Sequence, residues 1–228
     1  LRAGELRLLM FSVALAVAAL TAVGFLADRI QSGLWRDARQ LLGGDAVVVS
    51  DRPTPEVLVQ EAVKRGLVTN TNVSFPTMAR VPVADGASRL VALKAVAPGY
   101  PLRGVLQVRR GHGAAQDSIP PLGQVWVDEA LLEALDLAPG QLLALGDRAL
   151  RIGAVIEREP DRGAGFMNFA PRVMMNAADL ASTALVQPAS RVTWRMAVAG
   201  AEGVATSYAA WAREQAESGQ LRGVQVES

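Results

Sequence analysis

Residues 8–26 read LLMFSVALAVAALTAVGFL, a stretch of nineteen residues without a charged side chain. At about 1.5 Å of rise per residue, a helix of this length covers roughly 28 Å, close to the hydrocarbon thickness of a bilayer. Arg7 precedes the stretch, and Asp28 follows it after one alanine. We therefore predict a transmembrane helix over residues 8–26 and a cytoplasmic flank over residues 1–7.

A cleaved secretory signal peptide is the alternative interpretation, with cleavage near Ala16 or Ala19. The apolar stretch is longer than the apolar region of most such peptides, which favours a retained membrane helix. Ala14, Ala18 and Ala22 recur every four residues. This spacing predicts a small-residue face on which another membrane helix packs.

Charge predicts the orientation of the helix. The flank before it holds two arginines and one glutamate, and the positive-inside rule places such a flank in the cytoplasm. Large domains cross the membrane largely regardless of their own charge. We therefore expect the residues after about 27 outside the cytoplasm. Because residue 1 is leucine rather than methionine, we also expect the chain to be a fragment of a longer protein.

The helical apolar pattern continues over residues 27–42 and stops at Gly43–Gly44, where paired glycines end a helix. A continuous helix from about Glu5 to Leu42 would be on the order of 55 Å long. Such a helix is a stiff stalk that transmits movement from one end to the other. The alternative is an ordinary amphipathic linker that kinks near Gly33.

Strand and helix patterns alternate in the rest of the sequence and predict an α+β fold class. Residues 43–100 and 166–228 are expected to form the two halves of a mixed α/β body, with residues 101–165 as a small β-rich insertion. In the first half, Thr54 is the predicted N-cap of a helix that presents Leu58, Val59, Ala62 and Val63 on one face. Further helices are predicted over residues 128–137, 177–185 and about 204–215, and strands over residues 45–50, 73–80, 90–96, 124–127, 141–145, 148–156, 172–175, 191–198 and 224–226.

Composition and motifs exclude several kinds of site. The chain has no cysteine and a formal net charge of +1, which argues against thiol chemistry, zinc ribbons and broad nucleic-acid binding. The sequence lacks the P-loop, GxSxG, HExxH and EF-hand patterns. The single histidine, His112, lies between glycines in a predicted loop, and Gly163-Ala-Gly165 lacks the context of a phosphate loop. We therefore predict no catalytic, cofactor-binding or metal-ligating residues and no enzyme.

The densest polar cluster is Glu157-Arg-Glu-Pro-Asp-Arg162, which carries three carboxylates and two guanidinium groups. Opposite charges at this spacing favour an ion-pair network that holds a loop. A metal site or an acid/base site is the alternative. The candidate hinge or partner-docking loop comprises Glu157, Arg158, Glu159, Pro160, Asp161, Arg162, Pro171 and Arg172.

Several segments resemble a known family. The segments GELRLLMFSVALAVAALTAVGFLADRI, LLGGDAVVVS, VSFPTMARV, LKAVAPGYPLRG, GQVWVDEALLEAL and EPDRGAGFMNFAPRVMMNAADL together resemble the FtsX-like permeases of ABC transporters, a family that includes the MacB and LolC types. Within it, the sequence looks most like the YbbP group of predicted permeases. The resemblance covers nearly the whole chain, and EPDRG and APRVMMN are its most specific parts.

The resemblance implies a first transmembrane helix and a MacB-like periplasmic domain in the bacterial inner membrane, with three more helices after Ser228. It implies a separate ABC ATPase as partner, whose hydrolysis of ATP moves the periplasmic domains through long helices. It also implies a hydrophobic or envelope substrate and a periplasmic esterase or another envelope protein as partner. The family supplies no catalytic residues.

Two other classes of function stay open from the residues alone. One is a single-pass, membrane-anchored periplasmic binding or sensor domain, and the other is a secreted enzyme behind a signal peptide. The first predicts a protein with no ATPase partner, and the second predicts a shortened, soluble product.

Overall fold

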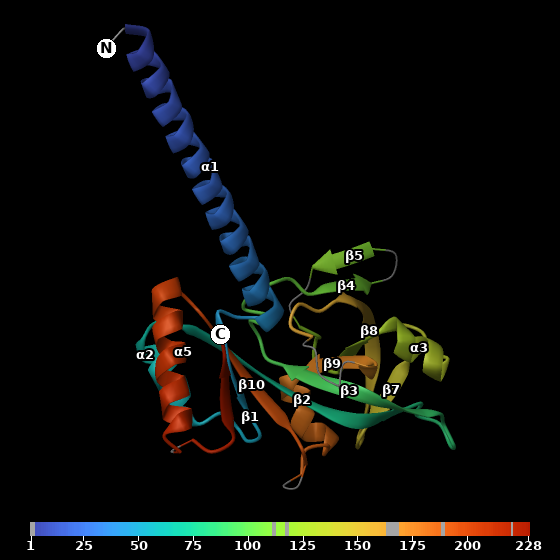
Figure 1. The fold of residues 1–228 in the computed structure, drawn as a ribbon. Helices are drawn as coiled ribbons and strands as arrows, with labels where there is room; N and C mark the ends of the chain where they lie inside the picture. The colour runs from blue at the N-terminus through green and yellow to red at the C-terminus, as the bar shows by residue number, and fades with distance from the viewer. Residues whose placement is uncertain (1–2, 111–112, 117–118, 163–168, 188–189, 220) are drawn as a thin grey trace. The chain divides into compact units, whose positions relative to one another are not determined.

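The computed structural model describes residues 3–110, 113–116, 119–162, 169–187, 190–219 and 221–228 (Figure 1). The chain divides into two compact units, Leu1–Ala38 and Arg39–Ser228. His112 and Gly163-Ala-Gly165 lie outside the described residues.

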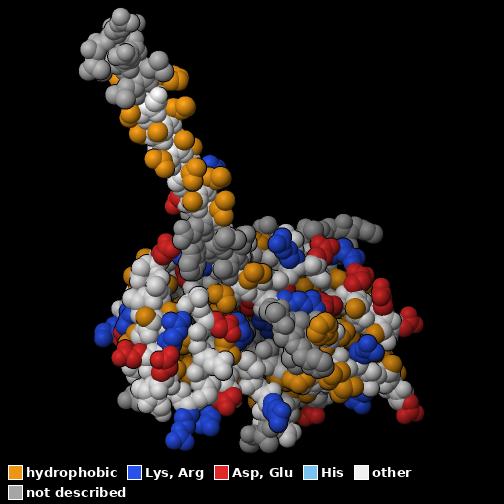
Figure 2. All heavy atoms as spheres, in the orientation of Figure 1, with side chains coloured by type: hydrophobic (Ala, Val, Ile, Leu, Met, Phe, Trp, Pro, Cys, Tyr) orange, Lys and Arg blue, Asp and Glu red, His pale blue; other side chains and the backbone are white. Residues whose placement is uncertain are grey.

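The first unit consists of most of α1, an uninterrupted helix over Ala3–Leu42. Its stretch Met10–Ile30 is long and apolar enough to cross a membrane, and no other described helix meets that criterion. Side chains along this stretch, such as Phe11 and Phe25, are exposed (Figure 2). An exposed apolar segment of this length is typical of a segment that contacts lipid or another protein.

The helix passes through Gly33 without interruption and ends at Leu42. Gly43 follows with a φ of +73°, a conformation that L-residues with a side chain rarely adopt. The paired glycines therefore end the helix, as their position in the sequence predicts.

The second unit is built on one twisted sheet. Its strands are β1 (Ala46–Ser50), β2 (Val68–Arg80), β3 (Ser88–Val96), β4 (Gln107–Arg110), β5 (Gly113–Gln116), β6 (Gln124–Val127), β7 (Leu142–Leu145), β8 (Arg148–Arg158), β9 (Arg172–Asn176), β10 (Thr193–Ala199) and β11 (Val224–Glu227). Its helices are α2 (Glu56–Lys64), α3 (Glu129–Leu135), α4 (Ala177–Leu180), the 3-10 turn η2 (Ala181–Thr183) and α5 (Glu202–Glu217).

The strand order is β11-β1-β10-β2-β3-β9-β6-β8-β4-β5, and β7 pairs with β2 and β8. Most neighbours are antiparallel, whereas β3 pairs with β9 and β6 pairs with β8 in parallel. Residues 101–165, predicted as a β-rich insertion, supply β4 to β8. Because β6 pairs with β9 and β7 pairs with β2, these strands continue the same sheet. The mixed α/β fold class predicted from the sequence is confirmed.

Three apolar cores are arranged around this sheet. Leu93 on β3 and Val173 on β9 belong to a core shared with α3 and β7, whereas Val96 and Met174 belong to a core shared with β4, β6 and β8. Successive residues of a strand point to opposite faces, so these two cores lie on opposite faces of the sheet. The third core packs α2 and α5 against β1, β10 and β11.

Some local predictions differ from the structure. Thr54 is not the N-cap of α2, because Pro55 takes an extended conformation and the helix begins at Glu56. The Thr54 hydroxyl is buried and has no partner among the described residues. Val63 is exposed rather than packed. The helix predicted to start after Asn176 does so, and the Asn176 side chain accepts a hydrogen bond from Ala178 N, but α4 is only one turn long.

Candidate functional site

A lysine and an arginine point from the centre of the sheet into its interior. Lys94 lies on β3 and Arg172 lies on the neighbouring β9, and the strand register aligns Lys94 with Met174. Both cations therefore occupy the face that carries Val96 and Met174. Each is almost fully buried, and burying a cation is unfavourable unless anions and hydrogen-bond acceptors surround it.

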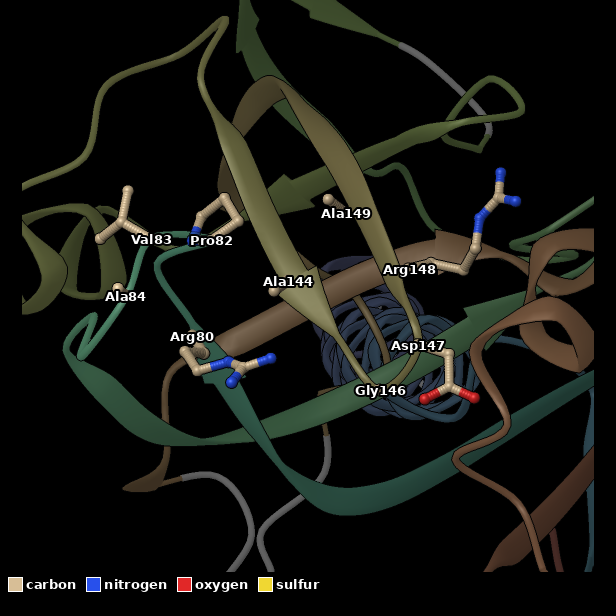
Figure 3. Close-up of a pocket in the computed structure, with 9 residues that line it drawn as sticks. All are labelled: Arg80, Pro82, Val83, Ala84, Ala144, Gly146, Asp147, Arg148 and Ala149. Atoms are coloured by element: carbon tan, nitrogen blue, oxygen red, sulfur yellow. The ribbon is translucent and has the colours of Figure 1, made fainter.

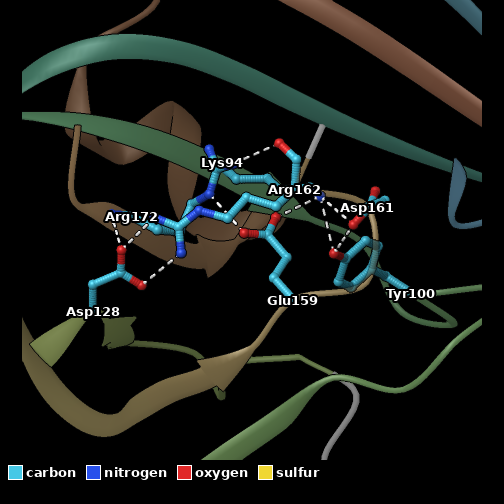
Figure 4. A network of polar contacts seen from close by, with 7 residues as sticks. All are labelled: Lys94, Tyr100, Asp128, Glu159, Asp161, Arg162 and Arg172. Atoms are coloured by element: carbon cyan, nitrogen blue, oxygen red, sulfur yellow. Dashed lines mark hydrogen bonds and ion pairs between the residues drawn. The ribbon is translucent and has the colours of Figure 1, made fainter. Parts of the chain in front are cut away.

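Glu159 and Asp161 supply the anions (Figure 4). They follow β8, where the chain turns back towards the sheet. Glu159 Oε1 lies 2.9 Å from Lys94 Nζ, and Glu159 Oε2 lies 2.8 Å from Arg172 Nε. Asp161 Oδ1 lies 2.7 Å from Lys94 Nζ. One carboxylate thus bridges both strands, and the next binds the lysine but not the arginine.

Tyr100 completes the environment of the lysine. Its hydroxyl accepts a hydrogen bond from Lys94 Nζ at 2.9 Å and donates one to Asp161. The three donors of the ammonium group are therefore used by Tyr100, Glu159 and Asp161. The ammonium group also lies 4.6 Å from the centroid of the Tyr100 ring, a favourable cation–π distance.

A second ion pair extends the arrangement. Asp128 accepts hydrogen bonds from Arg162 at 2.6 and 3.2 Å and from the backbone N–H of Arg172 at 2.9 Å. The hydrogen bonds that Arg162 donates to Asp128 raise the pKa of Arg162. We call this group of seven residues the Lys94 network: Lys94, Tyr100, Asp128, Glu159, Asp161, Arg162 and Arg172.

The charges of the Lys94 network balance, with three cations and three carboxylates. Burial opposes the ionisation of Glu159, but the charges and hydrogen bonds of Lys94 and Arg172 outweigh burial and lower its pKa to about 2. Burial and the nearby charges of Asp161 and Glu159 raise the pKa of Tyr100 well above its usual value. A general acid or base needs a pKa near the working pH. Glu159 and Tyr100 are therefore suited to holding chain segments together rather than to proton transfer.

The structure brings together four residues of the predicted hinge or docking loop, namely Glu159, Asp161, Arg162 and Arg172. Glu157 instead lies 3.3 Å from Arg109 on β4, in a partly exposed pair. The predicted ion-pair interpretation of this cluster agrees with these contacts. Within the described ranges, no group of three His, Asp or Glu side chains is arranged to hold a metal ion.

The other predicted loop residues make backbone or packing contacts. Arg158 is exposed at the end of β8. The carbonyl of Pro171 accepts a hydrogen bond from Ala92 N at 2.9 Å. Pro160 packs so closely on Gly104 that a Cβ at that glycine would lie 2.6 Å from Pro160 Cβ.

Sequence reasoning missed Lys94, Tyr100 and Asp128. One signal for Lys94 was available, because it is the only charged residue in the otherwise apolar segment LVALKAV of residues 90–96. A lysine in a buried strand requires a carboxylate partner. The partners themselves lie more than sixty positions along the chain, where spacing alone does not identify them.

A second ionic group surrounds the turn between α1 and β1. The side chain of Asp45 is 3% exposed and accepts hydrogen bonds from Arg103 at 2.8 and 3.0 Å and from Gly200 N at 2.9 Å. Arg39, in the last turn of α1, lies 3.9 Å from Asp45 and also pairs with Glu202 at the start of α5. We call Arg39, Asp45, Arg103 and Glu202 the Asp45 cluster.

The electrostatics of the Asp45 cluster favour the ionised carboxylate. Burial raises the pKa of Asp45, but the hydrogen bonds and charge of Arg103 and the N–H of Gly200 outweigh burial and lower it overall. The backbone N–H of Arg103 also donates to Gly43 O at 3.1 Å. The residues that follow α1 are therefore bonded to two other segments of the second unit, at Arg103 and at Gly200.

A shallow depression of about 490 Å³ lies elsewhere, where the end of β2 meets the β7–β8 hairpin (Figure 3). Its lining includes Arg80, Asp147 and Arg148, with small apolar residues between them. The charges have both signs and do not converge on one point in Figure 3. This depression therefore identifies no ligand.

The predicted helix-packing face remains a prediction. Ala14, Ala18 and Ala22 are all exposed on α1. Their spacing places them on one side of the helix.

Comparison with known proteins supports a transporter relationship. No family model matches the chain. The sequence is 36% identical over 210 residues to the uncharacterized ABC transporter permease YbbP of Escherichia coli (strain K12), an alignment that covers 92% of this chain. The chain spans only 25% of the length of that relative.

Solved structures show a similar fold. The extracellular domain of the noncanonic ABC-type transporter YknZ from Gram-positive bacteria matches with a TM-score of 0.51, covering 80% of this chain and 100% of that domain at 11% identity. The periplasmic region of MacB from Actinobacillus actinomycetemcomitans also matches with a TM-score of 0.51, covering 85% of this chain and 93% of that region at 10% identity. The resemblance predicted from the sequence is confirmed: the chain is related over nearly all of its length to a YbbP-type ABC transporter permease and has the fold of the extracytoplasmic domains of MacB and YknZ.

Proposed function

We propose that the chain forms the first membrane helix and the periplasmic domain of an inner-membrane ABC transporter permease that transmits movement. In this proposal residues 1–7 are cytoplasmic, the membrane span ends near residue 26, and the residues after about 27 are periplasmic. A separate ATPase supplies the energy from the cytoplasmic side. The division of the periplasmic part at residues 100 and 165 is also a proposal.

One observation carries this proposal. The helix α1 runs without a break from the apolar stretch Met10–Ile30 to Leu42. A continuous α-helix transmits an axial or rotational displacement along its length, whereas a flexible linker loses it. Within the Asp45 cluster, Arg39 in the last turn of α1 pairs with Asp45 and with Glu202 at the start of α5. This continuity favours a mechanical role over simple anchoring.

The proposed cargo is a hydrophobic molecule or a component of the cell envelope, and the proposed periplasmic partner is an esterase or another envelope protein. Both proposals follow from the family resemblance. Residues 157–162 together with Pro171 and Arg172 are proposed as a hinge, because Glu159, Asp161 and Arg172 among them are buried in the Lys94 network. Glu157 and Arg158 are exposed at the end of β8. We therefore propose partner docking for these two residues only.

Purification of the full-length protein in mild detergent, with a tag at its C-terminus, tests the proposal. Copurification of a stoichiometric P-loop protein with ATPase activity supports the transporter permease. Recovery of the intact protein alone and without ATPase activity would instead support the membrane-anchored binding or sensor domain, which the single apolar helix of the described residues also allows. A shortened, soluble product would support the secreted enzyme.

The mechanical part of the proposal needs its own test. We expect four glycines inserted between Ser32 and Leu34 to uncouple ATP hydrolysis from movement of the periplasmic domain, since each glycine destabilises a helix by about 1 kcal/mol relative to alanine. The matched control inserts four alanines at the same point and keeps the helix continuous. The measurement is the ATP-dependent change in hydrogen exchange over residues 39–228. Equal responses of both insertions would contradict transmission through a rigid helix.

A further inference from the structure

The turn after α1 touches the Lys94 network at one glycine. A Cβ added to Gly43 would lie 3.0 Å from Asp161 Cβ and 3.1 Å from its Cγ and Oδ2. Gly43 also has a φ of +73°. The absence of a side chain therefore lets the backbone of the turn approach the buried carboxylate of Asp161 directly.

A second glycine brings a third segment to the same place. A Cβ at Gly104 would lie 2.6 Å from Pro160 Cβ and 3.4 Å from the carbonyl oxygen of Gln40 in the last turn of α1. The neighbouring Arg103 N–H donates to Gly43 O at 3.1 Å. The end of α1 and the segment before β4 thus meet backbone to backbone, and the side chains of Pro160 and Asp161 after β8 pack directly on Gly104 and Gly43.

The contact continues into the sheet through charged groups. Asp161 Oδ1 lies 2.7 Å from Lys94 Nζ on β3, and Lys94 shares Glu159 with Arg172 on β9. A displacement of Asp161 therefore changes the position of a cation on β3 and, through Glu159, of one on β9. Buried ion pairs resist gradual separation, because each partly separated charge is left without solvent or a counter-ion. Such a network favours discrete arrangements over continuous deformation.

We propose that Gly43 and Asp161 form a positioning contact through which displacement of the last turn of α1 changes the arrangement of the Lys94 network and of strands β3 and β9. This inference rests on the proposed mechanical function and names the residues that would carry it. Gly104 and Pro160 keep Asp161 against the turn. The Asp45 cluster connects the turn and the last turn of α1 to Arg103, Gly200 and the start of α5, whereas the Gly43–Asp161 contact leads to Lys94 on β3.

The test uses the full-length permease together with its copurified ATPase and compares two glycine variants. Gly43→Ala places a methyl group against Asp161, whereas Gly66→Ala is the matched control. Gly66 has a φ of +74°, and a Cβ added there would meet open space. Both variants therefore place a side chain at nearly the same positive φ, and only Gly43→Ala adds an atom against Asp161.

We expect Gly43→Ala to reduce the ATP-dependent change in hydrogen exchange over residues 92–100 and 159–162 by roughly fivefold or more, the lower end of ordinary coupling between sites. Gly66→Ala should keep that change. Equal responses of the two variants would overturn the inference. A purely structural role would alter thermal stability in both variants without separating their responses to ATP.

A second variant keeps the test decisive if Gly43→Ala does not fold. Asp161→Ala removes the carboxylate that faces the turn and leaves the turn itself intact. We expect it to lose the same ATP-dependent response, and retention of a full response by this folded variant would also overturn the inference. If the unmodified permease shows no ATPase partner or no response to ATP, the proposed function fails instead, so the two failures are distinguishable.

Discussion

The Lys94 network and the Asp45 cluster both hold the segments around the end of α1, but they differ in their access to solvent. The side chains of Lys94 and Glu159 are 3% and 0% exposed. In the Asp45 cluster the carboxylate of Asp45 is 3% exposed, whereas Arg103 is 42% and Glu202 is 74% exposed. The centre of the Lys94 network, formed by Lys94, Glu159, Asp161 and Arg172, is closed to solvent, and only its edge at Arg162 is partly exposed. In the Asp45 cluster the central carboxylate is buried, but the groups that surround it are open to solvent.

This difference predicts different energetics for similar ion pairs. Removing one member of a buried pair leaves a desolvated charge without a partner, which typically destabilises a protein by about 3–5 kcal/mol. Water and salt ions replace a lost partner at the surface, so an exposed pair contributes roughly 0–1 kcal/mol. We therefore expect the loss in the free energy of unfolding to be smaller when the altered side chain is more exposed.

Lys94→Met should have the largest effect. It leaves Glu159 and Asp161 buried without their shared cation, and we expect the free energy of unfolding of the second unit to fall by about 3–5 kcal/mol. Lys64→Met is the matched control, because Lys64 is 80% exposed and lies 3.7 Å from Glu61. Chemical denaturation of the chain in detergent measures both. Similar losses in the two variants would remove the distinction between closed and open ion pairs.

Acidification should weaken the Lys94 network through Glu159. Its pKa is about 2 in the folded chain against an ordinary value of 4.5. As pH falls below about 4.5, the unfolded chain binds a proton that the folded chain does not, so this contribution to stability is complete above that value and disappears towards pH 2. Thermal unfolding against pH measures the decline. In the Glu159→Gln variant the decline over this window should be smaller, and an unchanged decline would assign it to other carboxylates.

Asp45→Asn should have an intermediate effect of roughly 2 kcal/mol, the range of hydrogen bonds to charged groups. The amide oxygen still accepts a hydrogen bond from Gly200 N, but the charge that holds Arg103 is lost. The exposed guanidinium group of Arg103 regains water, which limits the loss. Chemical denaturation compares this variant with Lys94→Met. A loss larger than that of Lys94→Met would reverse the proposed order of the two groups.

Glu202→Gln should have the smallest effect, below about 1 kcal/mol. Its partner Arg39 is itself partly exposed, and solvent competes for both groups. The difference from the unmodified chain should shrink further as the salt concentration rises, because ions screen exposed pairs. Unfolding at low and high salt measures this dependence, and a large effect that salt leaves unchanged would show that the pair is effectively buried.

Much of the local structure was predictable from the sequence. Nineteen uncharged residues over 8–26 indicate a membrane helix, and Gly43 and Gly44 mark the end of α1. The strands predicted over residues 141–145 and 148–156 are present as β7 and β8, which pair with each other antiparallel. The failures were also local in origin: Pro55 delayed the start of α2, and Ala184 with a φ of +54° ended the helical segment that begins at Ala177.

The candidate site was predictable only in part. Opposite charges over residues 157–162 indicate an ion-pair network, and the structure shows one around Glu159 and Asp161. The sequence does not indicate that Glu157 leaves this group for Arg109. Glu157 still lies on β8, where side chains alternate between the two faces of the sheet, whereas Glu159 and Asp161 follow its last residue, Arg158. The position at which the strand ends therefore decides which carboxylates reach the interior.

The sequence by itself determined the membrane-length helix, its end at paired glycines, the alternating elements of the second unit and the absence of known catalytic motifs. These features depend on residues that are near neighbours along the chain, where helical and strand periodicity act. Only the tertiary structure decided that Lys94, Tyr100, Asp128 and Arg172 surround Glu159 and Asp161, and that Gly43 lies against Asp161. The physical reason is that the pairing of β3 with β9 and the return of the chain after β8 bring distant charges together, and burial then requires each charge to find its partner.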